Sequence, residues 1–259
     1  MVEHALVLDD VTFSYGESPV LRRASQTFTP GRLTAICGPN GSGKSTLLGV
    51  ATGQLAAREG RVLLDGKDVR GLAHKARAQA MAMLPQSPDA PAELQVRDLV
   101  ALGRYARRRP LASLSAEDLG AIDTALAATE VSDLADRALS DLSGGQRQRA
   151  WIAMVLAQEA PLILLDEPTN HLDIAHAVET MTLLQRLVAE QGKTVVAVLH
   201  DINLMASHAD EVVLMQDGEI VASGAFEDTV TEAALSSLYG RACVFGQVPG
   251  RERPFIVVS

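Results

Sequence analysis

The sequence predicts an α/β fold in which a parallel β-sheet packs against helices. Short, continuous apolar runs with the length of buried strands, such as residues 162–165 and 194–199, alternate with longer segments of helical spacing. In addition, a glycine-rich loop at residues 38–45 follows the apolar run Leu33–Cys37 and precedes a helical pattern that begins at Thr46. Strand, glycine loop and helix follow one another in the order that a phosphate-binding unit requires.

The glycine loop reads GPNGSGKS and fits the pattern G-x-x-x-x-G-K-[ST]. Its glycines can adopt positive φ, so that backbone N–H groups can turn inward around phosphate oxygens. We expect Lys44 to reach the β- and γ-phosphates of a nucleotide and the Ser45 hydroxyl to ligate the accompanying Mg²⁺. An ordinary glycine-rich turn is the alternative. The nucleotide-binding residues predicted here are Gly38, Pro39, Asn40, Gly41, Ser42, Gly43, Lys44, Ser45 and Thr46.

Composition narrows the class of protein. With 259 residues and a net charge of -9, the chain can form a large core but does not have the basic balance of a dedicated nucleic-acid binder. Its two cysteines lie far apart and outside any metal-spaced cluster, and reduced thiols fit a cytoplasmic protein. We see no signal peptide, and the apolar runs are shorter than the roughly 20 residues that cross a bilayer. A membrane process would therefore need another chain to supply the membrane part.

The remaining elements follow from the spacing of apolar residues. Partial alternation predicts antiparallel strands at residues 6–13 and 20–28, joined by a turn at residues 15–19. Tyr15 on this turn could stack on a purine, although a packing role is the more common alternative. The basic run at residues 104–110 is interpreted as a solvated loop or a protein-contact surface. Further strands are predicted at 61–64, 80–84, 162–165, 194–199, 211–215, 219–223, 242–248 and 255–258, and further helices at 72–79, 96–104, 115–129, 147–158, 174–190 and 227–239.

Polar residues follow three of the predicted buried strands. Asp166 and Glu167 come directly after the run at 162–165, at the strand end where open α/β sheets bind ligands. We expect Asp166 to hold Mg²⁺ through water and Glu167 to orient or deprotonate the attacking water. His200 could bond the γ-phosphate or that water. Gln86 could supply an oxygen to a metal or water, with a solvated loop glutamine as the alternative.

A second glycine-flexible helix start lies at LSGGQ, residues 142–146. Its serine hydroxyl and free N–H groups make it a second potential anion site, with a simple helix cap as the alternative. His171 and His176 are interpreted as turn or helix-face residues, and the absence of a clustered third ligand argues against zinc.

The ordered set of motifs resembles the nucleotide-binding subunits of ATP-binding-cassette (ABC) transporters over essentially the full chain. The set comprises GPNGSGKS, Gln86, LSGGQ, LILLDE ending at Glu167, NHLD ending at Asp173, and His200. LSGGQ ahead of the apolar strand is highly specific to this class. The resemblance implies one ABC ATPase domain over residues 1–259. About 1–86 and 160–259 would form a RecA-like core with an antiparallel β-subdomain, and about 87–159 a helical subdomain carrying LSGGQ.

The resemblance also implies that two subunits face each other head to tail. ATP would lie between the glycine loop of one subunit and the LSGGQ residues of the other, which are Ser143, Gly144, Gly145 and Gln146. In this family pattern Tyr15 stacks on adenine, Gln86 contacts Mg²⁺ and senses the membrane partner, and Asp173 communicates across the dimer. His200 contacts the γ-phosphate and, with Glu167 and Lys44, forms the catalytic set.

Within the family, three stretches resemble the importers of iron chelates, a group that serves siderophores, haem and cobalamin. They are residues 96–104, 172–176 and 198–203, while Asn170, His171 and Ala177 depart from the usual siderophore pattern. We therefore expect an ATPase subunit that energises uptake of a ferric siderophore, with haem or cobalamin as alternative cargoes.

The expected partners are a second copy of the chain, two integral-membrane permease subunits and, indirectly, an extracytoplasmic substrate-binding protein, without nucleic acid. The expected location is peripheral, on the cytoplasmic face of the inner membrane. A soluble cassette ATPase acting on nucleic acid or ribosomes is an alternative from another class, but the chain has neither paired cassettes nor basic extensions. A non-enzymatic nucleotide sensor is the third class considered, and the presence of Glu167 and His200 argues against it.

Overall fold

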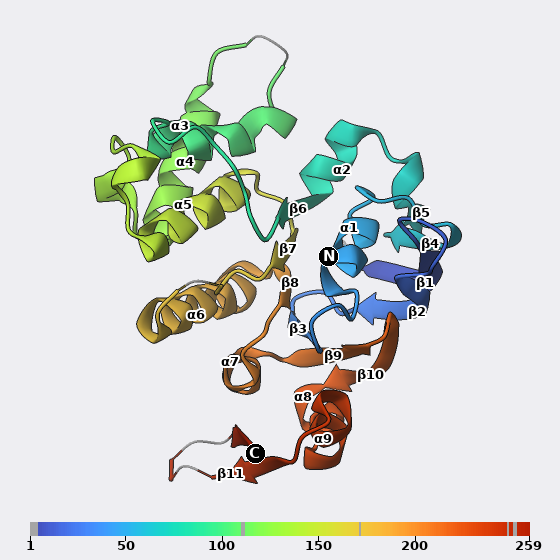
Figure 1. The fold of residues 1–259 in the computed structure, drawn as a ribbon. Coiled ribbons are helices and arrows are strands. Elements are labelled where there is room, and N and C mark those ends of the chain that lie inside the picture. The colour runs from blue at the N-terminus through green and yellow to red at the C-terminus, as the bar shows by residue number, and fades with distance from the viewer. Residues whose placement is uncertain (1–4, 110–111, 171, 248, 251–252) are drawn as a thin grey trace.

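A six-stranded sheet runs through the centre of the computed structural model, which describes residues 5–109, 112–170, 172–247, 249–250 and 253–259 (Figure 1). The strand order is β10-β9-β3-β8-β7-β6, and all neighbours are parallel except β10, which pairs antiparallel with β9 at one edge. The strands are β3 (Leu33–Cys37), β6 (Met81–Leu84), β7 (Leu162–Asp166), β8 (Thr194–Val198), β9 (Glu211–Gln216) and β10 (Glu219–Ala225). The predicted α/β class with a parallel sheet is confirmed.

The central strands are buried on both faces, which explains why they read as continuous apolar runs. In β7, Leu162 and Leu164 point to one hydrophobic cluster, while Ile163 and Leu165 point to the other. The residues of β8 divide between the two clusters in the same alternating way. Because side chains alternate along a strand, a sheet covered on both sides needs apolar residues at every position.

One face of the sheet is covered by a helix and a second, antiparallel sheet. In this sheet the order is β2-β1-β4-β5, so the predicted pair of strands at the N-terminus is confirmed and gains two further strands. The elements on this side are β1 (Leu6–Phe13), β2 (Leu21–Phe28), α1 (Lys44–Ala51), β4 (Glu59–Leu64), β5 (Lys67–Asp68), the short helix η1 (Val69–Gly71) and α2 (His74–Ala80).

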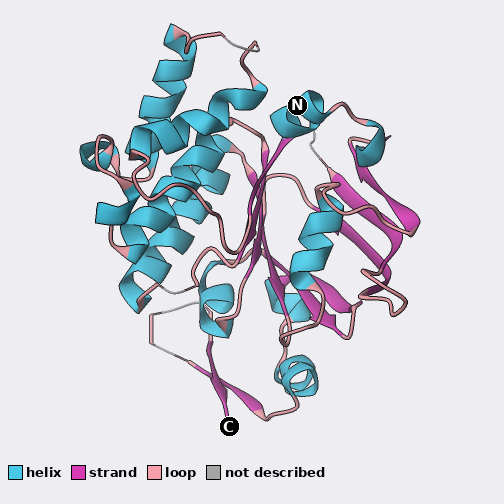
Figure 2. Ribbon diagram, turned by 45° about the horizontal axis from the view of Figure 1, so that its top comes forward, coloured by secondary structure: helices cyan, strands magenta, loops and turns pink. Residues whose placement is uncertain are grey.

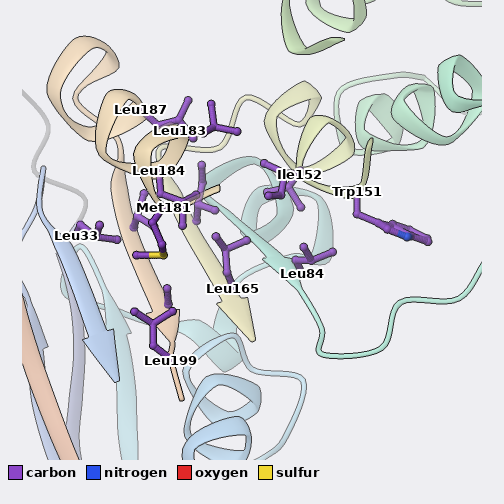
Figure 3. Close-up of a cluster of buried hydrophobic side chains, with 14 of the residues drawn as sticks. Leu33, Leu84, Trp151, Ile152, Leu165, Met181, Leu183, Leu184, Leu187 and Leu199 are labelled. Carbon is purple, nitrogen blue, oxygen red and sulfur yellow. The ribbon is translucent and has the colours of Figure 1, made fainter. Parts of the chain in front are cut away.

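The other face is covered mainly by helices, which gather on one side of the sheet in Figure 2. Figure 3 shows Met181 and Leu184 of α6 in one buried cluster with the strand residue Leu165. Two of the helices begin with a capping box, in which Ser115 pairs with Asp118 and Ser143 with Gln146. The helices are α3 (Val96–Leu102), η2 (Gly103–Ala106), α4 (Ala116–Ala128), η3 (Ser132–Leu134), η4 (Leu139–Asp141), α5 (Gly144–Ala157), α6 (Ile174–Gln191) and α7 (Ile202–His208).

The C-terminal region differs in one detail from the prediction. The helix expected at residues 227–239 is two helices, α8 (Phe226–Thr229) and α9 (Glu232–Tyr239), because Thr231 is extended and its hydroxyl caps the second one. A hairpin of β11 (Cys243–Gly246) and β12 (Phe255–Val258) follows. Expectations that concern His171, Pro110 and Val248 lie outside the described residues.

Arg104 is an exception to the interpretation of the basic run as a solvated loop or contact surface, whereas Tyr105 in the same run is exposed. The Arg104 side chain is 1% exposed and links three parts of the helical region. It donates to Asp118 of α4 at 2.9 Å, to the Ala157 carbonyl at 2.7 Å and to Glu159 at 2.7 Å. Sequence reasoning missed this burial because the carboxylates that compensate the charge are 14 and 55 residues away.

Removing Asp118 should destabilise the fold, because it leaves a buried guanidinium with fewer partners. We expect Asp118→Ala to lower the free energy of unfolding by about 2–4 kcal/mol, measured by urea denaturation. Asp123→Ala in the same helix is the matched control, since the Asp123 ion pair with Arg97 is exposed and should cost under about 1 kcal/mol. Equal losses in the two variants would contradict this account.

The same site has a pH dependence. Hydrogen bonds from the Ser115 backbone and hydroxyl, followed by one from Arg104, lower the pKa of Asp118 to about 2. A carboxyl group whose pKa is depressed in the folded state stabilises the fold above its unfolded pKa, near 3.8. This contribution should be lost as the pH falls from about 4 towards 2.

Candidate nucleotide-binding site

The glycine loop and the polar residues that follow β6, β7 and β8 come together at one edge of the central sheet. Strands β3, β6, β7 and β8 are parallel, so their carboxyl ends lie along the same edge. A cavity of about 560 Å³ opens there. It is lined by Val20, Asn40, Gly41, Gly43, Lys44, Ser45, Thr46, Gln86, Glu167, Asn170 and His200.

The glycine loop wraps the amino end of α1. Gly43 caps this helix with φ 98°, and Gly41 has φ 79°, both in the left-handed region that favours glycine. At Gly38 a lack of space excludes other residues, because a Cβ there would collide with the carbonyl oxygen of Met215. The N–H groups at the start of α1, together with its dipole, favour an anion at the loop.

Lys44 is buried and is held by the loop itself. Its Nζ donates to the carbonyl oxygens of Gly38 and Pro39, each at 2.9 Å. Burial lowers the pKa of Lys44, while the nearby carboxylates Asp166 and Glu167 act in the opposite direction. The loop thus places a cation among helix N–H groups at the base of the cavity, which is the charge that a polyphosphate requires.

The Glu167 carboxylate is fixed by partners from three separate segments. Gln86 donates to Oε2 at 2.6 Å, Asn170 donates to the same oxygen at 3.0 Å, and His200 Nε2 lies 2.5 Å from Oε1. Since a carboxylate can only accept, His200 carries a proton on Nε2 in this arrangement. The backbone of Glu167 has φ 55°, in the left-handed region that turn residues such as Asp65 and Asp217 also adopt in this chain.

Asp166 and Ser45 form a second polar pair beside this carboxylate. The Ser45 hydroxyl donates to Asp166 Oδ1 at 3.1 Å. Burial raises the pKa of Asp166, the bond from Ser45 opposes that rise, and the neighbouring Glu167 charge adds to it. A buried carboxylate next to another is costly without a cation. The oxygen donors of Ser45, Asp166 and Gln86 therefore fit Mg²⁺, which takes one or two carboxylates together with phosphate oxygens and water.

Other predicted residues lie apart from the cavity lining. Tyr15 is 69% exposed and packs edge-on against Phe13, with ring centroids 4.9 Å apart. Ser143 caps α5 by accepting from the backbone N–H of Gln146 at 3.3 Å. Asp173 caps α6 by accepting from the backbone N–H of His176 at 2.9 Å. One chain thus assembles the glycine loop, Gln86, Glu167 and His200 around one cavity but not the LSGGQ residues.

Sequence reasoning missed Asn170 as a partner of Glu167. In the sequence it is the first residue of NHLD and a departure from the siderophore pattern, whereas in the structure it lines the cavity and its amide bonds the carboxylate. The available signal was its position three residues after Glu167 in a tight turn, where the Asn170 backbone N–H also bonds the Glu167 carbonyl. Val20, which precedes β2, also lines the cavity and carries no signal of this kind.

The sheet, the glycine loop and the polar strand ends define an ATP-binding cassette. The family model described as ABC transporter matches residues 21–170, and the chain belongs to this family.

Several curated relatives match over nearly the whole chain. It is 40% identical to the ferric enterobactin transport ATP-binding protein FepC of Escherichia coli, with 96% of this chain and 92% of the relative covered. It is 42% identical to the probable siderophore transport system ATP-binding protein YusV of Bacillus subtilis, with 95% and 89% covered. It is 37% identical to the iron(3+)-hydroxamate import ATP-binding protein FhuC of Bacillus subtilis, with 91% and 88% covered.

Solved structures share the fold. An inward-facing ABC transporter assigned to the metal-chelate type superposes with a TM-score of 0.87 at 28% identity, covering 100% of this chain and 98% of the other. A dimeric, post-hydrolysis structure of the cassette MJ0796 with ADP and phosphate gives 0.75 at 31% identity, covering 85% and 98%. Among the described residues, no helix combines the length and the apolar character needed to cross a membrane.

The close approach of Gly38 to Met215 gives a test of the loop. We expect Gly38→Ala to displace the loop from β9 and to cost about 1–3 kcal/mol of stability through overpacking, with weaker ATP binding. Thermal unfolding and nucleotide titration measure the two effects. Gly71→Ala is the control, because nothing lies within 4 Å of its Cβ position. ATP affinity equal to that of the unmodified chain would contradict the proposed loop geometry.

Proposed function

We propose that this chain is the ATP-hydrolysing subunit of an ABC importer that takes up a ferric siderophore. The observation that supports the hydrolytic role most directly is the Glu167 carboxylate, held by Gln86, Asn170 and His200 at the mouth of a phosphate-binding loop. A non-enzymatic nucleotide sensor would not need a carboxylate fixed by three side chains at that place.

In the proposed mechanism the glycine loop and Lys44 bind the β- and γ-phosphates. Glu167 accepts a hydrogen bond from the attacking water and takes its proton as the water oxygen bonds to the γ-phosphorus, while the bond from that phosphorus to the β–γ bridging oxygen breaks and ADP leaves. His200 holds the carboxylate through Nε2 in this structure, and in the proposed scheme it would turn that N–H to a γ-phosphate oxygen when nucleotide binds. In this structure Gln86 donates to the other carboxylate oxygen. In the proposed scheme it would give up this bond when nucleotide binds, and its amide oxygen would then be free to contact the metal.

Mg²⁺ is the proposed metal, and Ser45, Gln86 and Asp166 are the residues that would hold it, Asp166 through water. When bound, it supplies positive charge to the phosphate oxygens. The chain contributes the oxygen donors and the buried position of Asp166, whose raised pKa would return towards its ordinary range beside a cation.

We propose that the working unit is a homodimer. The LSGGQ helix start does not line the cavity of its own chain, and its N–H groups form a separate place for an anion. The MJ0796 cassette is a dimer in its post-hydrolysis structure. In the proposed arrangement Ser143 to Gln146 of one copy face the phosphates that the other copy holds, Tyr15 stacks on adenine, and Asp173 lies at the contact between the copies.

The permease subunits would dock at a groove that β6 helps to line and that shares none of the described residues with the nucleotide cavity. This groove of about 720 Å³ has an apolar floor that includes Met81 and Met83 and a rim of cationic side chains. Tyr105 lies beside it and is 83% exposed. The groove is lined by Thr52, Gln54, His74, Lys75, Arg77, Ala78, Met81, Met83, Tyr105, Ala106, Arg108, Arg109 and Gln158. Since β6 leads within two residues to Gln86, movement of a docked partner would reach the Glu167 carboxylate directly.

The cargo is inferred from the relatives. The ferric enterobactin, siderophore and iron(3+)-hydroxamate proteins each match about nine-tenths of the chain at 37–42% identity. The proposed location is therefore the cytoplasmic face of the cell membrane, beside two permease subunits and, through them, a substrate-binding protein. Haem or cobalamin import by the same subunit is the alternative, which transport assays distinguish.

The role of Glu167 is tested by replacing it with an amide. We expect Glu167→Gln to keep ATP affinity near that of the unmodified chain while kcat falls by about 10²–10⁴, the range for loss of a general base. Lys44→Ala should instead weaken ATP binding, because it removes the charge that reaches the phosphates. Steady-state hydrolysis and equilibrium nucleotide binding separate the two effects. Normal turnover by the Glu167 variant would exclude the proposed base.

The docking groove and the cargo can be tested together. In cells that lack the chromosomal copy of this chain, the unmodified chain should restore uptake of a labelled ferric siderophore, and Tyr105→Glu should not. The isolated Tyr105 variant should still hydrolyse ATP, because it lies outside the nucleotide cavity. Val221→Glu is the control, since Val221 is also an exposed apolar residue, at 51%, and lies on β10.

Restoration of haem or cobalamin uptake, with no effect on siderophore uptake, would replace the proposed cargo. Full transport by the Tyr105 variant would remove the groove as the docking site. Salt-sensitive binding of nucleic acid by the purified chain would favour the soluble ATPase class instead.

A further inference from the structure

The N-termini of α5 and α6 meet at Gly145 and His176. Gly145 is the second glycine of LSGGQ and is buried. A Cβ added to it would lie 2.5 Å from Cδ2, 2.7 Å from Cγ and 3.1 Å from Nε2 of the His176 ring. Distances this short are not compatible with a side chain at position 145, so the ring occupies the space that any other residue would need.

The ring of His176 is held in this place by the carboxylate that caps its helix. Asp173 Oδ1 accepts from the backbone N–H of His176 at 2.9 Å and lies 2.7 Å from ring Nδ1. Because the carboxylate accepts, Nδ1 carries the proton in this arrangement. Rotation of the ring away from Gly145 would therefore break the hydrogen bond to Asp173. These bonds, first from the His176 backbone and then from its ring, also lower the pKa of Asp173.

A second contact fixes the spacing of the two helices about one turn further along. Arg149 of α5 donates to Glu179 of α6 at 2.8 Å, and the arginine side chain is 19% exposed. The buried hydroxyl of Thr180 donates to the His176 carbonyl, which ties the histidine to its own helix. A tilt of α5 away from the histidine ring, to make room for a side chain, would therefore stretch the ion pair between Arg149 and Glu179.

We propose that His176 is a positioning residue that sets the start of the LSGGQ helix against Asp173. Glycine in a helix is less favourable than alanine, so its presence calls for a packing or functional reason. The structure supplies one within the chain, since Gly145 leaves room for the histidine. Asp173, His176 and Gly145 then move as one unit, which joins the two segments that the proposed dimer would present to the other copy. The inference that this unit faces the other copy rests on the proposed function.

The competing explanation is that Gly145 is required only for close approach of the other copy's nucleotide. The two explanations differ in one result, because only the contact within the chain can be relieved by making position 176 smaller. Asparagine is the suitable replacement, since its amide can keep the hydrogen bond to Asp173 while the outer edge of the ring is removed. A comparison of Gly145→Ala, His176→Asn and the double variant with the unmodified chain measures this coupling.

We expect Gly145→Ala to lower kcat/KM for ATP by about tenfold or more, because the displaced helix start is misplaced against the nucleotide, and to lower the Tm, because the added methyl group overpacks the contact with His176. His176→Asn alone should raise the KM for ATP severalfold with kcat nearly unchanged, because the helix start is less well placed while Glu167 is untouched. The double variant should recover the Tm and the kcat/KM of His176→Asn, since the added methyl group then has room.

A double variant as impaired as Gly145→Ala in both readouts would overturn the proposal, as would a Gly145→Ala protein with the Tm and activity of the unmodified chain. Recovery of the Tm without recovery of kcat/KM would overturn the positioning role, as would an unchanged KM in His176→Asn. If the unmodified chain hydrolyses no ATP, the proposed function fails, whereas the Tm comparison still tests the contact between Gly145 and His176.

Discussion

A sheet buried on both faces can present polar groups only where its strands end, and this constraint places the whole site. Alternate residues of β7 and β8 pack into two different hydrophobic clusters. Polar catalytic and ligand-binding side chains therefore lie at the ends of these strands rather than within them. Since β3, β6, β7 and β8 are parallel, the residues that follow them reach one edge together. Glu167 can therefore be fixed by Gln86 and His200, which lie 81 and 33 residues away.

The parts that could be predicted from the sequence are those in which local pattern and three-dimensional position coincide. Continuous apolar runs identified the buried strands because burial on both faces removes the usual alternation. The glycine loop was identified from its spacing, because positive φ at Gly41 and Gly43 is a local requirement. The cap of α4 is local in the same sense, because Ser115 and Asp118 lie three residues apart. Parallel order then explains why the strand-end residues share one cavity.

The parts that could not be predicted depend on contacts between distant segments. Arg104 looked solvated because its carboxylate partners lie on α4 and beyond the end of α5. The reason for glycine at position 145 is a ring from another helix, which leaves no trace in the LSGGQ segment itself. The pairing of β4 with β1 and of β5 with β4 is likewise a matter of topology rather than local pattern. The roles of the individual site residues remain predictions that kinetics must test.

The central claim is that one copy holds only half of each nucleotide site, because the LSGGQ helix start and the glycine loop do not share a cavity. The most direct measurement is sedimentation of the Glu167→Gln protein with and without ATP and Mg²⁺, with the bound nucleotide counted per dimer. The account predicts an ATP-dependent dimer with two nucleotides, which a further Ser143→Arg change disrupts while ATP still binds to the monomer. A protein saturated with ATP that stays monomeric, alone and with its permease, would contradict it.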